Sequence, residues 1–482
     1  MRQTLAIATG KALLEILHRT GRGGTALPGL VAARLDPHIL NGLTARLPAG
    51  SVVVTGTNGK TTTTRLLATI LQAARLKVVN NRSGSNLIRG LTSTLLDNVS
   101  FTGKPQADIG LFEVDEAALP QVVADIAPKI ILVNNLFRDQ LDRYGEIDTI
   151  RKRWIEAVKK LSPGTTLVLN ADDPSVAYLA RFAPDGVKAV FFGLDDPHQE
   201  LGSLPHAVDA TRCLVCSYSL TYTAVYISHM GHYHCPNCGY TRPEPTFVAS
   251  AIKLVNPIIK DDTGSLSLQT PTGPLELKLA LPGLYNAYNA TGAATAALLL
   301  GLAPGHIQQG IASFKAAFGR IERVDLPQDK QLVLALVKNP VGFNEVLRTL
   351  TGFATGTEQP QQTAAGGATL QKLRLLIVIN DLVADGRDVS WLWDVDFEVL
   401  AGRVEWVVTS GIRATDMAVR LKYAGIAPEN IQVVPDLAQA ITQASDKLLT
   451  GQTLFVTPTY TAMLQTREIL QKQGLVLPFW AE

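Results

Sequence analysis

The 482-residue chain carries little net charge, few aromatic residues and no long apolar run. Its 44 lysines and arginines nearly balance 42 aspartates and glutamates, so nothing supports a nucleic-acid footprint or a polybasic membrane patch. The longest apolar stretch, near residues 293–303, falls well short of the roughly 20 residues that span a bilayer. Lys11 and Glu15 interrupt the short apolar start, so no secretion signal is visible. We therefore expect a cytoplasmic protein with no transmembrane segment and no nucleic-acid partner.

Cysteine is missing everywhere except in one 26-residue window. There it forms two C-x-x-C pairs with eighteen residues between them: Cys213, Cys216, Cys235 and Cys238. This spacing matches a Cys₄ zinc ribbon, in which four thiolates leave no open position for chemistry. Three histidines between the pairs could compete as ligands: His229, His232 and His234. The window predicts a structural zinc site, and unmetallated cysteines are the alternative.

Hydrophobic residues make up 46% of the chain and charged residues 18%, enough to bury large cores in two or three domains. Short apolar runs at 51–55, 77–80, 108–114, 130–135 and 166–173 alternate with helical patterns, which is typical of a doubly wound parallel α/β sheet. A second α/β unit begins near Asp325, with strands expected near 332–337, 373–379, 404–409 and 453–456. A low-complexity loop occupies 355–369. We expect domains at 1–320 and 321–482, with the cysteine insertion at 205–245 inside the first.

The segment Thr55–Thr62, TGTNGKTT, lies between an expected strand and an expected helix at 63–74. Glycines there would let backbone N–H groups approach phosphates, and a helix N-terminus favours anions. We expect nucleotide contacts from six consecutive residues: Thr57, Asn58, Gly59, Lys60, Thr61 and Thr62. Lys60 would reach the β- and γ-phosphates, and the Thr61 hydroxyl would bind Mg²⁺. The common GxxxxGK[ST] spacing needs glycine where Val54 stands, so this is a tighter variant. A turn that merely caps a helix is the alternative.

A carboxylate beside the metal is the next requirement. Glu113 ends the 108–114 run and would point from the edge of the sheet where ligands bind in open α/β folds. Asp115 and Glu116 follow it, and ordinary solvated acids are the alternative for all three.

At this point the sequence resembles the Mur ligases, ATP-dependent enzymes that activate a carboxylate as an acyl phosphate and then form an amide bond. The resemblance rests on TGTNGKTTT, Glu113, NNLFRDQLD at 134–142, NADD at 170–173 and LYNAYNATGA at 284–293. NLFRDQLDRYGE, the four-cysteine insertion and NDLVADGRDVSWLWDVDFE at 380–398 are most similar to the MurT type, the ligase-like subunit of lipid II isoglutaminyl synthase. The resemblance covers nearly the whole chain.

The resemblance implies ATP and Mg²⁺ as cofactors, held by Lys60, Thr61 and Glu113. It also implies that Asn286 and Asn289 contact the adenine and that Arg320 reaches the γ-phosphate. Helix capping and a surface position are the respective alternatives. Two departures stand out: Gln140 replaces the family's metal-binding histidine, and only Arg151 and Lys152 lie near the place of its carbamylated lysine.

For the C-terminal loop, the resemblance implies that Asp388 or Asp385 completes a Cys–His pair on a separate GatD-type glutaminase subunit. Helix capping and pairing with Arg387 are the alternative for both acids. Asn339 would keep part of the family's ribose contact.

The implied reaction converts the α-carboxyl of D-glutamate in the lipid II stem peptide to D-isoglutamine, at the inner face of the membrane. An amino-acid-adding Mur or folylpolyglutamate-type ligase working alone is the rival enzyme. A zinc-ribbon module acting on nucleic acid is the rival from another class.

Overall fold

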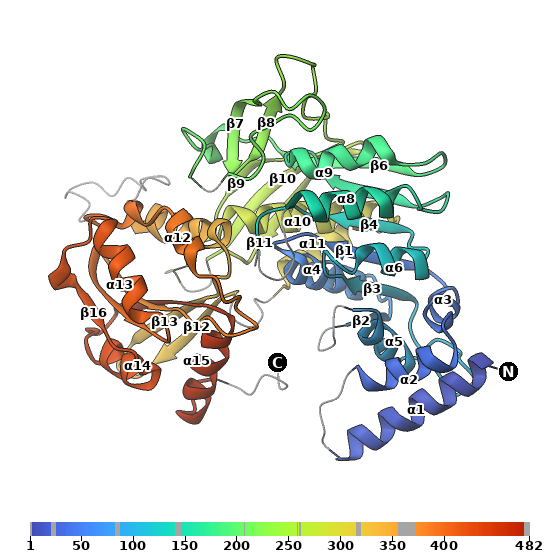
Figure 1. Ribbon diagram of the computed structural model, residues 1–482, viewed down its shortest axis with the longest axis horizontal. Helices are drawn as coiled ribbons and strands as arrows, with labels where there is room; N and C mark the ends of the chain where they lie inside the picture. Colours follow the sequence, from blue (N-terminus) through green and yellow to red (C-terminus); the bar gives the residue numbers. More distant parts are fainter. Residues whose placement is uncertain are drawn as a thin grey trace.

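Two β-sheets organise the chain in the computed structural model (Figure 1). The structure describes residues 2–20, 26–81, 87–139, 147–206, 208–257, 259, 262–314, 320–354 and 372–476. The expected low-complexity loop at 355–369 and Gln140 lie outside these residues. Strands β1 to β11, apart from one hairpin, form the first sheet, and β12 to β17 form the second.

The first sheet has nine strands in the order β11-β10-β9-β6-β5-β4-β1-β3-β2. Their bounds are β1 Ser51–Thr55, β2 Val78–Asn80, β3 Ile109–Glu113, β4 Ile130–Val133, β5 Thr166–Asn170, β6 Lys188–Leu194, β9 Phe247–Lys253, β10 Gly264–Thr270 and β11 Gly273–Leu279. In this order, every pair of neighbouring strands between β9 and β2 is parallel, as the alternating pattern predicts. The pairs β9–β10 and β10–β11 are antiparallel. The neighbouring strands β3, β1 and β4 therefore end at one edge of the sheet, which is where the phosphate loop begins.

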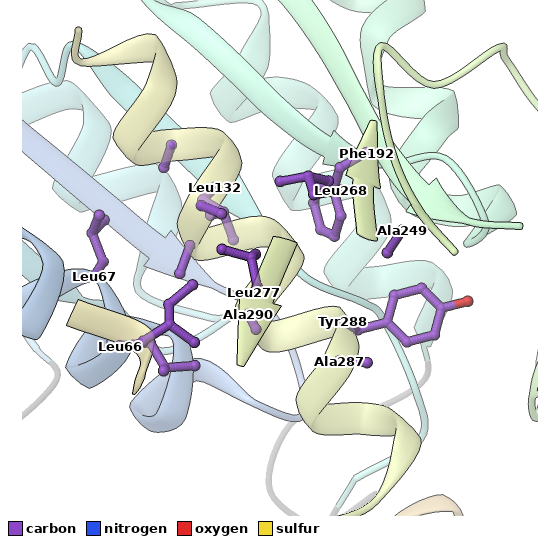
Figure 2. Packing of buried hydrophobic residues seen from close by; sticks show 14 of the residues in the cluster. Leu66, Leu67, Leu132, Phe192, Ala249, Leu268, Leu277, Ala287, Tyr288 and Ala290 are labelled. Atoms are coloured by element: carbon purple, nitrogen blue, oxygen red, sulfur yellow. The ribbon is translucent and has the colours of Figure 1, made fainter. Parts of the chain in front are cut away.

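Helices cover both faces of this sheet, because its central strands are mainly apolar and nearly every position in them is buried. All five residues of β1 are buried, and alternate residues feed two separate cores: Val52 and Val54 face one, Val53 the other. The covering helices are α4 Lys60–Ala73, α5 Ile88–Asp97, α6 Leu119–Asp125, α8 Ile147–Val158, α9 Pro174–Ala177, α10 Leu284–Leu299 and α11 Pro304–Ala312. Leu66 of α4 and Ala290 of α10 meet on one face (Figure 2). Each fully buried leucine there contributes about 2 kcal/mol.

Three helices precede β1 and lie at the β2 end of the sheet (Figure 1). They are α1 Arg2–Thr20, α2 Leu27–Leu35 and α3 Ile39–Thr44, and each of them contacts α5.

The second sheet has six strands in the order β12-β13-β17-β14-β15-β16. Their bounds are β12 Arg320–Leu326, β13 Lys330–Ala335, β14 Leu373–Val378, β15 Val404–Ser410, β16 Ile431–Val433 and β17 Thr453–Pro458. Helices α12 Pro340–Ala354, α13 Ala414–Tyr423, α14 Leu437–Asp446 and α15 Tyr460–Lys472 accompany them. The short edge strand β16 escapes sequence reasoning because three half-exposed residues carry no clear periodicity.

The cysteine window contains a two-stranded sheet of its own. Strands β7 Thr221–Ile227 and β8 Met230–His234 pair as an antiparallel hairpin that stands beside the edge of the first sheet (Figure 1). No helix among the described residues is long and apolar enough to cross a membrane.

Candidate nucleotide and metal sites

The phosphate loop joins β1 to α4 and contains two glycines whose backbone φ is positive. Gly56 has φ +137° and Gly59 has φ +84°. A Cβ at Gly59 would lie 2.1 Å from Asn289 Oδ1, so a side chain there would displace Asn289 as well as strain the backbone. Asn135 brackets the turn: its Oδ1 accepts from Asn58 N at 2.8 Å and its Nδ2 donates to Asn58 O at 3.1 Å. The expected strand, loop and helix thus occur in the expected order.

Lys60 is the buried cation of the loop. Its Nζ donates to Gly56 O at 2.6 Å and to Glu116 Oε2 at 2.9 Å. Burial would lower the pKa of Lys60, but the charge and hydrogen bond of Glu116, with Glu113 and Asp139 nearby, outweigh it and raise the pKa. Lys60 is therefore fully charged at neutral pH, as a phosphate ligand must be. Sequence reasoning named Glu116 among the acids that follow β3, with a solvated acid as the alternative, because a carboxylate three residues beyond a strand gives no signal of its partner.

Glu113 ends β3 next to the loop. Thr61 Oγ1 donates to Glu113 Oε1 at 3.0 Å, and Asn81 orients the backbone of Glu113 through two hydrogen bonds of 2.9 and 3.0 Å. A hydroxyl and a carboxylate this close are hard oxygen donors of the kind Mg²⁺ prefers. This donor set fits the expected metal, which would sit between Thr61 and Glu113.

The asparagine pair on α10 is buried beside the loop rather than exposed at a helix cap. Asn289 Oδ1 accepts from Thr63 Oγ1 at 3.2 Å, and Asn289 Nδ2 donates to Asn286 Oδ1 at 3.1 Å. Asn286 Nδ2 in turn donates to Pro282 O at 2.7 Å. Asn289 lines a cavity of about 140 Å³ that also opens onto Asn58. Asn286 lies behind Asn289, so it orients its neighbour.

The C-terminal domain closes over this cavity. Lys338 Nζ lies 3.2 Å from Thr57 O and 2.6 Å from Asp139 Oδ2, and Asn339 Nδ2 donates to Asn58 Oδ1 at 3.0 Å. Asn339 therefore contacts the phosphate loop directly. Sequence reasoning did not assign a role to Lys338 or Asp139, since their pairing joins positions 199 residues apart. For Arg320, the backbone begins β12, but its side chain lies outside the described residues.

The two candidate aspartates of the C-terminal loop differ sharply. Asp385 is 6% exposed and accepts hydrogen bonds from Leu382 N, from Thr461 N at 2.7 Å and from Thr461 Oγ1 at 2.5 Å. It thereby holds the first turn of α15. Asp388 is exposed and its Oδ1 accepts from Ser390 N at 2.8 Å, and this bond lowers the pKa of Asp388. Both border a second cavity together with Arg138 and Lys338.

The four cysteines converge as their spacing predicts. Their Sγ atoms all lie within 4.8 Å of one another, and two pairs, Cys213–Cys238 and Cys216–Cys235, are 3.5 Å apart. Tetrahedral zinc at about 2.3 Å from each sulfur places sulfurs about 3.8 Å apart, so the cluster fits that ion. Within the described part of the chain no other group of His, Cys, Asp or Glu gathers its ligand atoms in this way. The three nearby histidines are not part of the cluster.

Comparison with known proteins agrees with this geometry. Residues 54–239 match the model of the Mur ligase middle domain, and residues 336–463 match that of the MurT ligase C-terminal domain. The chain is 33% identical, over 99% of its length and 98% of the relative's, to the MurT subunit of the glutamine-hydrolysing lipid II isoglutaminyl synthase of Streptococcus pneumoniae. It is 31% identical to the corresponding Staphylococcus aureus subunit over 98% of each chain.

Solved structures share the fold at lower identity. A pseudomurein peptide ligase type C from Methanothermus fervidus aligns with a TM-score of 0.65 at 21% identity, over 88% of this chain and 78% of that one. MurF from Thermotoga maritima, solved in complex with ADP, aligns with a TM-score of 0.61 at 13% identity, over 92% and 84%. Escherichia coli FolC, with ADP, aligns at 0.53 and 16% identity, over 91% and 92%. A phosphate loop facing a cavity between two α/β domains, a four-cysteine unit and full-length similarity together place this chain in the Mur ligase family of ATP-dependent ligases, within its MurT group.

Proposed function

We propose that the chain is the ligase subunit of an enzyme that amidates the α-carboxyl of D-glutamate in the lipid II stem peptide. A carboxylate oxygen attacks the γ-phosphorus of ATP, which gives an acyl phosphate and releases ADP. Ammonia then attacks the acyl carbon, phosphate leaves with the electron pair of the C–O bond, and a proton is lost as the amide forms. The observation that carries this proposal is the match to MurT subunits along the full chain. It is supported by Lys338, which lines both the cavity at the phosphate loop and the cavity at the C-terminal loop.

The residues around the two cavities would have different roles in this reaction. Lys60 would stabilise charge that moves onto the phosphate oxygens, and Mg²⁺ held by Thr61 and Glu113 would neutralise it further. Asn289 would contact the adenine, supported from behind by Asn286, and Arg320 would approach the γ-phosphate from the start of β12. Lys338 lies at the junction of the two cavities, where the acyl phosphate would form.

Ammonia would come from a GatD-type glutaminase partner, because all four cysteines of this chain belong to the metal cluster and none is left as a nucleophile. Asp388 is the better candidate to orient the partner's histidine. Its carboxylate is exposed and ionised, whereas the carboxylate of Asp385 is occupied by hydrogen bonds from Leu382 and Thr461. A lipid-linked substrate would confine the reaction to the inner face of the membrane.

The test is ATP turnover by the purified chain with lipid II and ammonium chloride, followed by mass spectrometry of the lipid product. We expect ADP release matched by a mass change of hydroxyl replaced by amine. Product only after a glutaminase subunit and glutamine are added would mean that the partner orders the site. No product under either condition, but turnover with a free amino acid, would instead support a ligase of the amino-acid-adding type.

A further inference from the structure

The tip of the β7–β8 hairpin is buried, although hairpin turns normally lie at the surface. Its four residues are almost inaccessible: Ile227 is 3% exposed, Ser228 4%, His229 0% and Met230 1%. The turn needs a left-handed backbone at Ser228, with φ +51°. A strained turn that buries two polar and two apolar side chains requires an explanation beyond metal binding at the other end of the hairpin.

The tip reaches the nucleotide cavity. Ile227 and Met230 line the same cavity as Asn58, Gly59 and Asn289. They form part of its apolar wall, which α10 and the start of α12 continue. Small-molecule sites are usually lined by apolar side chains, with a few polar groups that fix the orientation of the ligand. This cavity has that composition, which suits a nucleoside base.

The tip also supports the phosphate loop from behind. The His229 ring packs against Phe137, with ring centroids 5.0 Å apart. Phe137 N donates to Thr57 Oγ1 at 3.0 Å, and Thr57 Oγ1 donates to Phe137 O at 3.2 Å. One packed ring therefore separates the hairpin from a residue of the phosphate loop.

The C-terminal domain also contacts the hairpin, through hydrogen bonds from α12. Arg348 of α12 donates to Tyr226 O and to Gln199 O, each at 2.7 Å. Helix α12 begins at Pro340, directly after the Lys338 and Asn339 contacts with the phosphate loop. The hairpin thus touches both domains whose junction forms the cavity.

The cysteine cluster holds the open end of this hairpin. Cys235 follows the last residue of β8, and the pairing of Thr221 with His234 marks that end of the ladder. The six residues from Met230 to Cys235 span roughly 17 Å. A small two-stranded unit is marginally stable without added support, so the position of the tip depends on the metal that would close the other end.

From these contacts we infer that the hairpin tip is a wall of the nucleoside site, and that metal binding by the four cysteines and nucleotide binding by the phosphate loop are thermodynamically coupled. Each ligand then raises the affinity for the other by the same factor. The inference rests on the assignment of this cavity to the nucleoside of ATP, but it does not depend on which acceptor is amidated.

The first test compares ADP·Mg²⁺ binding by calorimetry in the zinc-loaded wild type and in Ile227→Ala and Met230→Ala. We expect each variant to bind ADP about fivefold more weakly, because it loses apolar contact with the base. Thr223→Ala, an exposed position on the same strand, is the matched control and should bind as wild type does. Wild-type affinity in both tip variants, with unchanged metal content, would overturn the wall assignment.

The second test needs no variant. Competition with a chelator measures the zinc affinity of the wild-type chain with and without saturating ADP·Mg²⁺. We expect tighter zinc retention with ADP, and equal zinc affinity in both conditions would overturn the coupling. Lys60→Ala distinguishes a failure of the coupling from a failure of the nucleotide-site assignment. If it weakens ADP binding while the tip variants do not, the nucleotide site stands and only this inference fails. If wild type binds no ADP, the nucleotide assignment fails as well.

Discussion

The phosphate loop and the C-terminal loop at 380–394 both end parallel strands, yet their polar groups are used in opposite ways. In the phosphate loop, charged side chains are buried and paired within the chain, as Lys60 is with Glu116. In the C-terminal loop, Asp388 is exposed, and so are apolar neighbours such as Val383 and Trp393, which are 74% and 55% exposed. Buried, mutually oriented groups suit chemistry on a small bound molecule, whereas an exposed acid among exposed apolar residues suits contact with another protein.

The largest effect is expected in the phosphate loop, where the charged side chains are buried. Lys60→Ala should lower ATP-dependent amidation by about 1,000-fold or more, because it removes the buried ammonium group that would stabilise charge on the phosphates. ADP release measures the loss, and circular dichroism checks the fold. Lys159→Ala, an exposed lysine paired with Glu156, is the control and should leave turnover unchanged. Retained turnover in Lys60→Ala would remove the phosphate-loop assignment.

The exposed loop should separate the two nitrogen sources. Asp388→Asn is expected to lower glutamine-driven activity on the order of 100-fold, since an amide no longer stabilises a histidinium on the partner. Activity with ammonium chloride should be retained.

Asp385→Asn is the matched comparison for Asp388→Asn. It places an NH₂ donor among the N–H and O–H groups that the carboxylate now accepts from. We expect a loss of about 1–3 kcal/mol in unfolding free energy and a similar decline with both nitrogen sources. Equal loss of both activities in Asp388→Asn would argue for a role in the ligase step instead of the partner's triad.

Removing one cysteine thiolate should destabilise the four-cysteine insertion. Cys213→Ser is expected to lose about one zinc per chain and to lower the melting temperature, because structural zinc contributes directly to folding. Metal analysis and a melting curve measure both effects. Val215→Ser, an exposed change two residues away, should alter neither quantity. Unchanged metal content in Cys213→Ser would contradict the zinc assignment.

An effect on stability alone is expected at Glu345 of α12, a buried carboxyl group that lines the nucleotide cavity. Burial raises the pKa of Glu345 from 4.5 to about 7, and Arg348 offsets this only in part. The folded state therefore holds a proton that the unfolded state has lost between these values, so Glu345 reduces stability as pH rises from 4.5 to 7.

Glu345→Gln should consequently stabilise the chain by about 1–3 kcal/mol above pH 7, and this gain should vanish near pH 4.5. Thermal unfolding of wild type and variant across that range measures it. Glu429→Gln, an exposed acid of the same domain, should show no such trend. A pH-independent difference would mean that Glu345 has another partner in solution.

Much of the fold could be predicted because parallel strands are short apolar runs and their helices are amphipathic. The strand at 51–55 agrees with its expected bounds, and β14 and β15 differ by one residue at their ends. Helix α4 begins at Lys60 instead of Thr63, because the loop residues already adopt helical geometry to aim their N–H groups. The antiparallel edge of β10 and β11 was not predicted in detail, since alternation alone does not tell strand direction.

The sequence by itself determined the features whose residues are neighbours along the chain. Strand, loop, Lys60 and Thr61 come in one order, and two C-x-x-C turns carry their own ligand geometry, so covalent spacing is sufficient. Only the tertiary structure decided that Glu116 pairs with Lys60, that Asp385 is consumed by α15 while Asp388 stays exposed, and that the hairpin tip enters the nucleotide cavity. These contacts join residues far apart in sequence, and the packing of whole layers, which no local pattern encodes, brings them together.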